Sequence, residues 1–370
     1  MIEKSYKYRI YPNKKQRQLL NQTFGCVRFV YNHYLDKRIK VYETDKTTFG
    51  YTKCSSDLTR LKKQSDFEWL NNADSIALQS SLKNLETAFK NFFENPKTGF
   101  PKFKSKKTHS YSYTTKYTNR NIELFGKHIK LPKLGLVKTK VSRPTSGRIL
   151  SATVSQTPSG KYYVSVCCKE VKVVTLPKTG KSVGLDLGIK DFLIFSDPSA
   201  SIENPKYLQN DLKQLVRFQK SLSRKTIGSC RWNKARIKVA KLQEKIKNKR
   251  NDFLHKLSTR IIKEYDVVCI EDLNVSGMIK NHRLARNIAD VSWSEFIRQL
   301  IYKAGWYGKE VAKVDRFFPS SQICNICGYK NSEVKDLSIR TWICPKCGSM
   351  HDRDKNSAIN ILNEGLRIVT

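Results

Sequence analysis

The chain has 370 residues, with 70 Lys and Arg against 32 Asp and Glu and a formal net charge of +38. Its length indicates about two to four domains, and a hydrophobic content of 39% supports real cores and excludes wholesale disorder. Self-repulsion on this scale destabilises a compact chain unless a polyanion neutralises it. We therefore favour a nucleic-acid partner over a merely lysine-rich solvated surface.

No apolar stretch approaches the length of a membrane-spanning helix, and the opening residues MIEKSYKYRIYPNKK lack the apolar core of a signal peptide. We expect a cytoplasmic protein that does not act at a membrane. Of ten cysteines, six are scattered, as expected of reduced core thiols rather than a disulfide framework. These six are Cys26, Cys54, Cys167, Cys168, Cys230 and Cys269.

The first expected element is a short strand in which Tyr6, Tyr8 and Ile10 alternate with Lys7 and Arg9. This alternation predicts one apolar face and one basic face.

Helical spacing of apolar residues follows the strand. It predicts a helix from Lys14 to about Tyr42, capped by Asn13, and a second helical region from about Thr59 to Phe93. Residues 95–117, NPKTGFPKFKSKKTHSYSYTTKY, then break the pattern with Pro, Gly and basic residues. Their aromatic rings interleave with lysines, a combination that holds single-stranded or RNA-containing ligands. A hydrophobic anchor inside a basic loop remains the simpler alternative.

From residue 121 to residue 170 the apolar period changes to two. Several short strands are expected here, forming a small antiparallel barrel or sheet. The tip Pro158-Ser159-Gly160 predicts a hairpin, and TLPKTGKS, residues 175–182, is typical of a linker.

The run VGLDLGIK, residues 183–190, predicts a buried strand that holds one acid, Asp186. A lone ionised carboxylate there is costly unless a cation pairs with it, and the run contains no Lys or Arg before Lys190. Gly184 and Gly188 lack side chains, so a backbone or a ligand can come close. The GLDLG pattern alone is weak, because phosphate-binding strands of actin-like ATPases are similar.

After a further strand, DFLIFSD, residues 205–260 predict two long helices broken near Gly228. Residues 206–260 hold 17 Lys and Arg against three acids, which favours a phosphate-facing helix pair over a solvated hairpin. Candidate nucleic-acid contacts along the chain are Tyr8, Arg9, Lys102, Phe103, Lys104, Lys106, Lys107, Tyr111, Arg231 and Lys234.

Two more segments deliver acids. YDVVCIEDL predicts a buried strand that ends on Glu271-Asp272, and HDRDKNSAIN predicts a turn that becomes a helix and carries Asp352 and Asp354. Glu271 could be an idle strand-end carboxylate, and either aspartate could simply cap the helix.

Two buried strands and a helix that each deliver an acid indicate a carboxylate cluster. Like charges that close must share protons or bind metal. Mg²⁺ prefers oxygen ligands and keeps water and phosphate oxygens in its remaining shell. We expect two Mg²⁺ ions, which would activate a water and stabilise the leaving 3′-oxygen in phosphodiester hydrolysis.

The cysteines of CNICG and CPKCG form a C-x₂-C, sixteen-residue, C-x₂-C pattern. This spacing predicts a zinc ribbon in which four thiolates close one structural, tetrahedral Zn²⁺ site. An iron–sulfur cluster is less favoured without a longer cysteine run. The expected ligands are Cys324, Cys327, Cys344 and Cys347.

Motifs along nearly the whole chain resemble the TnpB family, the RNA-guided nucleases of bacterial insertion sequences, which are thought to be ancestral to type V CRISPR effectors. They include YKYRIYPNKKQRQLLNQTFGCVRFVYN, GFPKFKSKK, GLDLGIKDF, CIEDLNVSGM, WSEFIRQLIYKAGWYGKEVAKVDRFFPSSQICNICG and HDRDKNSAINIL. The resemblance implies that the catalytic acids are Asp186, Glu271 and Asp354. The family's last acid is followed by one residue and then Asn, which selects Asp354 over Asp352.

The resemblance also implies a multidomain α+β fold. A wedge-like β-barrel is expected at residues 1–12 plus 105–175, and a helical recognition region at residues 13–104. An RNase H-like RuvC nuclease domain is expected at residues 176–316 plus 351–370, with the zinc ribbon inserted at residues 317–350.

The implied function is an endonuclease that binds an RNA from its own element's end and cleaves double-stranded target DNA beside a short recognised motif, using Mg²⁺. Three alternatives stay open: a guide-dependent DNA-binding repressor without cleavage, a DNA-joining transposase, and an ATPase built on GLDLG.

Overall fold

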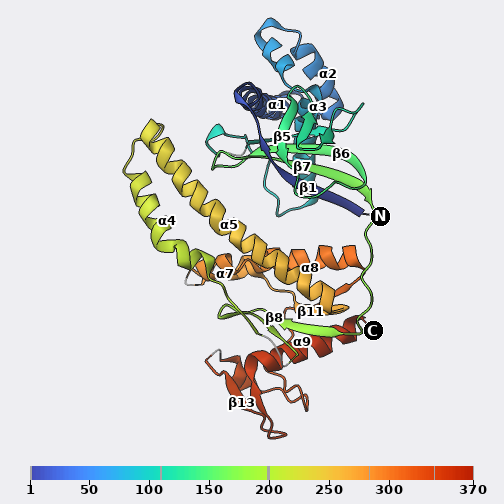
Figure 1. The fold of residues 1–370 in the computed structure, drawn as a ribbon, viewed down its shortest axis with the longest axis vertical. Helices are drawn as coiled ribbons and strands as arrows, with labels where there is room; N and C mark the ends of the chain where they lie inside the picture. Colours follow the sequence, from blue (N-terminus) through green and yellow to red (C-terminus); the bar gives the residue numbers. More distant parts are fainter. Residues whose placement is uncertain (1, 109–110, 198–200, 283, 337, 370) are drawn as a thin grey trace. The chain divides into compact units, whose positions relative to one another are not determined.

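The computed structural model describes residues 2–108, 111–197, 201–282, 284–336 and 338–369. The chain folds as two compact units, residues 1–172 and residues 173–370, which are taken in turn (Figure 1). Among the described residues, no helix combines the length and the apolar composition that a bilayer span requires.

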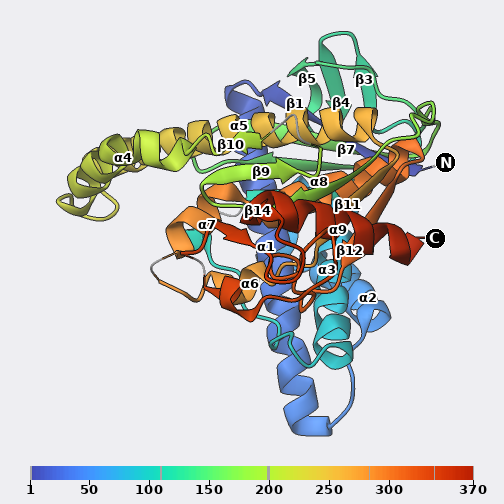
Figure 2. The same cartoon turned by 90° about the horizontal axis from the view of Figure 1, so that it is seen from below.

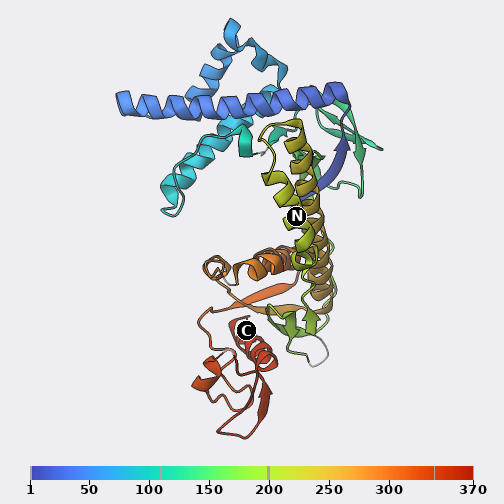
Figure 3. The same cartoon turned by 90° about the vertical axis from the view of Figure 1, so that its left-hand side faces the viewer.

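The helical part of the first unit is built on one long helix. Helix α1 (Lys14–Asp45), the long blue helix of Figure 3, confirms the predicted helix. Asn13 caps it through a reciprocal capping box with Gln16. The second predicted helical region is broken into α2 (Tyr51–Leu61), the 3₁₀ helix η1 (Ser65–Asn72) and α3 (Ser75–Glu94). Asp74 accepts a hydrogen bond from the backbone of Ile76, and this cap restarts the helix.

The strands of the first unit form a seven-stranded antiparallel sheet of order β2-β6-β7-β1-β5-β4-β3, so β2 and β3 are its edges. The strands are β1 (Ile2–Tyr11), β2 (Tyr111–Lys116), β3 (Glu123–Phe125), β4 (His128–Leu131), β5 (Gly135–Lys140), β6 (Arg148–Gln156) and β7 (Tyr162–Val171). A short 3₁₀ turn, η2 (Lys106–Thr108), precedes β2. The predicted hairpin is confirmed: β6 pairs with β7, and Gly160 at the tip has φ +84°.

The second unit is centred on a five-stranded sheet of order β10-β9-β8-β11-β12. Strands β8, β11 and β12 are parallel, whereas β9 and β10 join by antiparallel pairing. The strands are β8 (Ser182–Asp186), β9 (Asp191–Phe195), β10 (Ser201–Glu203), β11 (Val267–Glu271) and β12 (Glu310–Val314).

Helices cover both faces of this sheet. On one face, side chains of α5 (Cys230–Glu264) and α8 (Trp293–Tyr307) form the main core with alternate strand residues such as Leu185 and Ile270. On the other face α9 (Arg353–Val369) packs, with Ile361 against Cys269 (Figure 2). The short helices α6 (Val275–Met278) and α7 (Ala285–Val291) lie between β11 and α8 in sequence.

The predicted helix pair is confirmed as α4 (Tyr207–Ser223) and α5, which lie side by side in Figure 1. The break falls at residues 224–229, where Gly228 has φ +88°. Leu215 of α4 packs on Leu242 and Ile246 of α5, and this apolar seam holds the hairpin together.

Candidate active site and zinc ribbon

The ends of two parallel strands place two acids side by side. Asp186 is the last residue of β8 and Glu271 is the last residue of β11. These strands are neighbours, and their register places Leu185 opposite Ile270. Both carboxylates therefore leave the sheet at the same carboxyl edge, where ligands bind in open α/β sheets.

Helix α9 brings the third acid to this edge. A Cβ on Gly184 would lie 2.1 Å from the carbonyl oxygen of Ala358, and one on Gly365 would lie 2.4 Å from Cys269 Sγ. The two glycines thus let α9 lie directly on β8 and β11. Because strand side chains alternate, Asp186 and Glu271 point to the face of Gly184 and Cys269, which is the face that α9 covers.

Asp354 lies in the first turn of α9, close enough for its charge to act on Asp186. Burial, followed by the charges of Glu271 and Asp354, together raise the pKa of Asp186 to about 8. Burial also raises the pKa of Glu271, opposed by a hydrogen bond from Ser320. Asp186 is thus within electrostatic range of both other acids, an arrangement that a cation would stabilise.

The neighbouring acids have other partners. Asp352 accepts hydrogen bonds from the backbone of Asp354 and Lys355, so it caps the N-terminus of α9. Helix capping was one of the alternatives that the sequence left open for this residue. Asp272 forms ion pairs with Lys313 and Arg316.

Sequence reasoning missed three polar residues around the acids. Ser320 donates a hydrogen bond to Glu271, and Arg340 Nη1 lies 3.5 Å from Asp354 Oδ2. Arg353 is buried, donates to the carbonyl oxygen of Asp336, and its charge lowers the pKa of Asp186. Ser320 and Arg353 lie within two of the TnpB-like motifs. Only their contacts in the folded structure distinguish them from neighbouring residues.

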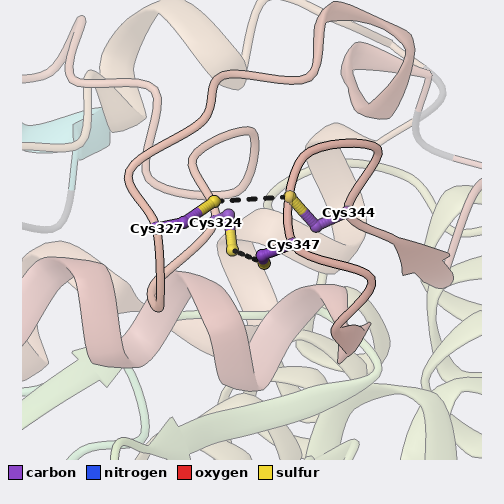
Figure 4. A group of neighbouring side chains, drawn as sticks. All are labelled: Cys324, Cys327, Cys344 and Cys347. Carbon is purple, nitrogen blue, oxygen red and sulfur yellow. Dashed lines mark hydrogen bonds between the residues drawn. The ribbon is translucent and has the colours of Figure 1, made fainter.

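The four predicted cysteines do come together (Figure 4). Their Sγ atoms all lie within 4.8 Å of one another, with Cys324 and Cys347 3.7 Å apart and Cys327 and Cys344 3.5 Å apart. A tetrahedron with Zn–S bonds of about 2.3 Å has edges of about 3.8 Å, so the cluster fits Zn²⁺.

Two equivalent knuckle turns shape this cluster. Gly328 and Gly348 have φ +72° and +71°, and each donates its backbone N–H to the first cysteine of its pair. The second pair is followed by the hairpin strand β14 (Met350–Asp352), which pairs with β13 (Thr341–Ile343). His351 of β14 is buried, with Nε2 3.1 Å from Cys324 Sγ.

The candidate nucleic-acid contacts divide into buried and exposed side chains. Tyr8 is only 1% exposed and its hydroxyl donates to the carbonyl oxygen of Arg143, so the expectation that it contacts a nucleic acid is wrong. Arg9 and Tyr111 are half-buried, and the Arg9 guanidinium lies over the rings of Tyr11 and Tyr163. The exposed candidates are Lys102, Phe103, Lys104, Lys106, Lys107, Arg231 and Lys234.

A further basic surface lies on α4. An open groove along this helix is lined by Lys213, Arg217, Lys220, Arg224 and Lys225. The charge count over residues 206–260 indicated such a surface but could not say which residues form it.

Family comparisons cover most of the chain. Residues 165–282 match the OrfB family of IS605, described as a probable transposase, and residues 293–361 match the TNB domain of Cas12f1-like proteins. Residues 1–47 match a family described as a helix-turn-helix domain, although residues 2–47 form the strand β1 and the single helix α1.

Whole-length relatives give a consistent result. A protein of Streptomyces pristinaespiralis named as an RNA-guided DNA endonuclease is 39% identical, over 99% of this chain and 90% of its own length. InsQ of Escherichia coli K12, named in the same way, is 33% identical over 98% of this chain and 92% of its own length. A cryo-EM structure of the Cas12f1–sgRNA–target DNA complex shares the fold, with TM-score 0.57 and 14% identity, over 98% of this chain and 99% of that chain. The chain belongs to the TnpB family.

Proposed function

We propose that the protein is an RNA-guided DNA endonuclease of a transposable element, and that Asp186, Glu271 and Asp354 are its catalytic residues. The observation that carries this proposal is the carboxylate cluster at the carboxyl edge of β8 and β11. Burial and mutual repulsion raise the pKa of Asp186 to about 8. A lone structural aspartate would have no reason to sit beside two other acids.

The donor set fits divalent magnesium, because the cluster offers carboxylate oxygens and has no thiolate or imidazole ligand among its three acids. When bound, two Mg²⁺ ions would polarise the scissile phosphate, activate a water and stabilise the leaving 3′-oxygen. The acids hold the cations at the sheet edge, and Asp354 gains support as an anion from the positive end of α9. The mixed five-stranded sheet supports a RuvC-type, RNase H-like assignment.

The partners follow from charge. A guide RNA and a double-stranded DNA target together supply the polyanion that +38 charges require. Candidate phosphate contacts are the exposed lysines of residues 102–107, which precede β2, the exposed basic residues of α5, and the basic groove on α4. In this class of enzyme, guide pairing carries most sequence specificity and the protein reads a short flanking motif.

The two compact units accommodate a finer division, which we also propose. Residues 1–12 plus 105–175 would be the wedge-like domain and residues 13–104 the recognition region. Residues 176–316 plus 351–370 would be the nuclease domain, with residues 317–350 as the zinc ribbon.

The deciding experiment is cleavage of matched duplex DNA by the guide-loaded protein with and without Mg²⁺. The Asp186→Ala protein should bind RNA and DNA nearly as the wild type does but should not cut. Asp272→Ala, which removes an acid beside Glu271 that is paired with Arg316, is the matched control and should still cut. Binding without cutting by the wild type would favour a repressor, and strand-transfer products with element-end DNA would favour a transposase.

A further inference from the structure

Ser320 occupies the segment that joins the nuclease sheet to the first zinc knuckle. It follows β12 and precedes Cys324, yet its side chain is only 5% exposed. The Ser320 hydroxyl donates a hydrogen bond to Glu271 Oε1. This contact joins a residue outside the sheet to an acid at the end of β11.

The hydroxyl of Ser320 is engaged on both sides. Ser357 of α9 donates its own hydroxyl to Ser320 Oγ at 3.0 Å. A hydroxyl that accepts from Ser357 points its single proton elsewhere, and here the proton points at Glu271 Oε1. The three groups form a directed chain from α9 through Ser320 to the carboxylate.

The backbone around Ser320 is held by the same helix. Asn360 Nδ2 donates to the carbonyl oxygens of Ser320, at 2.8 Å, and Ile323, at 2.6 Å. Asn356 Nδ2 donates to Ile323 at 2.7 Å and accepts from the backbone of Asn325 at 3.0 Å. Four contacts from one face of α9 therefore fix the segment that carries Ser320.

We propose that Ser320 is a positioning residue that holds the Glu271 carboxylate in its divalent-metal-binding orientation, with Ser357 and Asn360 holding Ser320 in turn. The inference rests on the proposed nuclease function. Its structural content is that α9 sets two of the three acids: Asp354 directly, and Glu271 through the serine chain.

The physical need for such a device comes from the glutamate side chain. Glu271 leaves a strand end on a flexible stem, beside Asp186, and the two negative charges repel each other. Without a fixed donor, ordering that stem upon metal binding costs side-chain entropy. Hydrogen bonds that orient metal-binding carboxylates are worth roughly 10- to 100-fold in metal affinity or activity.

The test compares Ser320→Ala with Ser258→Ala in the full-length protein. Ser258 is a fully buried serine of the same unit that bonds Leu254, Gln299 and Lys303 and none of the three acids. Two quantities are measured: Mn²⁺ binding to the protein without nucleic acid, by electron paramagnetic resonance, and the Mg²⁺ dependence of cleavage by the guide-loaded complex. Melting temperatures report folding.

Ser320→Ala should weaken Mn²⁺ binding and raise the Mg²⁺ midpoint roughly 10-fold or more. Ser258→Ala should lower the melting temperature and leave both metal midpoints unchanged. Ser357→Ala should shift the midpoints in the same direction as Ser320→Ala but by less, and Ser320→Thr, which keeps the hydroxyl, should restore them.

A folded Ser320→Ala protein with wild-type Mn²⁺ binding and a wild-type Mg²⁺ midpoint would overturn the inference. If Ser320→Ala does not fold, Ser357→Ala decides in its place, and unchanged midpoints there would overturn it equally. A wild type that binds Mn²⁺ but never cuts would instead contradict the proposed function, while the Mn²⁺ comparison would still judge Ser320.

Discussion

The carboxylate cluster and the cysteine cluster lie in the same unit but are assembled in opposite ways. The cysteines come from two local turns, each shaped by its own glycine at Gly328 and Gly348. The acids come from three segments more than eighty residues apart at each step, and only the docking of α9 on β8 and β11 unites them. The cysteine cluster therefore depends on short sequence spacing, whereas the acid cluster depends on the folding of the whole sheet.

The two sites also differ in how the metal-free chain tolerates them. Hydrogen bonds from Ser349 lower the pKa of the Cys347 thiol, while the neighbouring thiols raise the pKa of Cys327, so the thiols favour Cys347 as the group that ionises first. In the acid cluster the pKa of Asp186 is raised instead, so the metal-free cluster resists its own ionisation. The contrast predicts a zinc site that serves folding and an acid site that is strained until it is occupied.

The largest effect should come from the acids themselves. Glu271→Gln keeps the shape of the side chain and its contact with Ser320 but removes a charge, and we expect cleavage to fall by roughly 10³-fold or more. Single-turnover cleavage of guide-matched DNA measures this loss. Substantial cleavage by the folded Glu271→Gln protein would contradict the assignment of Glu271 as a catalytic residue.

Breaking the cysteine cluster should affect folding before chemistry. Cys344→Ser should abolish stoichiometric zinc and unfold the ribbon, because structural zinc supplies folding free energy. Metal analysis by mass spectrometry and thermal melting provide the readout. Cys230→Ser, at an exposed cysteine of α5, is the control and should keep one zinc per chain. Equal zinc content in both variants would contradict the assignment of the ligands.

The docking of α9 can be broken without touching either set of ligands. Gly184→Ala places a methyl group against backbone atoms of α9, so we expect a loss of about 3 kcal/mol in the free energy of unfolding, together with reduced cutting. Gly305→Ala, in α8, meets nothing within 4 Å and should be neutral or slightly stabilising. Chemical denaturation of the two variants measures the difference, and equal stabilities would argue against close docking.

The smallest effect concerns the pH dependence of stability. The folded-state pKa of Asp186 is about 8, above its ordinary value of 3.8, so its contribution to stability is complete below pH 4 and is lost as the pH rises through 8. Asp186→Asn should therefore stabilise the magnesium-free protein at pH 9 by about 1 kcal/mol, discounted because the carboxyl is half-buried, and should have little effect at pH 4. Thermal melting of the two proteins measures this difference, in metal-depleted buffer without a chelator so that bound zinc is retained. A larger stabilisation by Asp186→Asn at pH 4 than at pH 9 would contradict the raised pKa of Asp186.

Local patterns predicted those parts of the fold that local forces determine. The capping box at Asn13, the hairpin tip at Gly160 and the break at Gly228 each follow from a single residue's backbone or side-chain preference. The interruption before Asp74 and the short strand β10 depend on tertiary packing, and sequence periodicity missed both.

The candidate site divides along the same line. The four cysteines could be identified from spacing, Asp186 from its place inside an apolar run, and Glu271 from its place at the end of one. Ser320 could not, because a serine's role depends on which atoms surround it after folding. Tyr8 is instructive, since the alternation that predicted a basic face for Arg9 already placed Tyr8 on the opposite, buried face.

The docking of α9 also has a consequence during protein synthesis. A ribosome makes β8 and β11 long before it makes the helix that carries Asp354, and that helix also holds the chain from Ser357 to Glu271. If Asp354 is catalytic, as we propose, a nascent chain would expose its basic surfaces before it carries all three acids. Prematurely terminated products that lack α9 would then bind nucleic acid but not cut it.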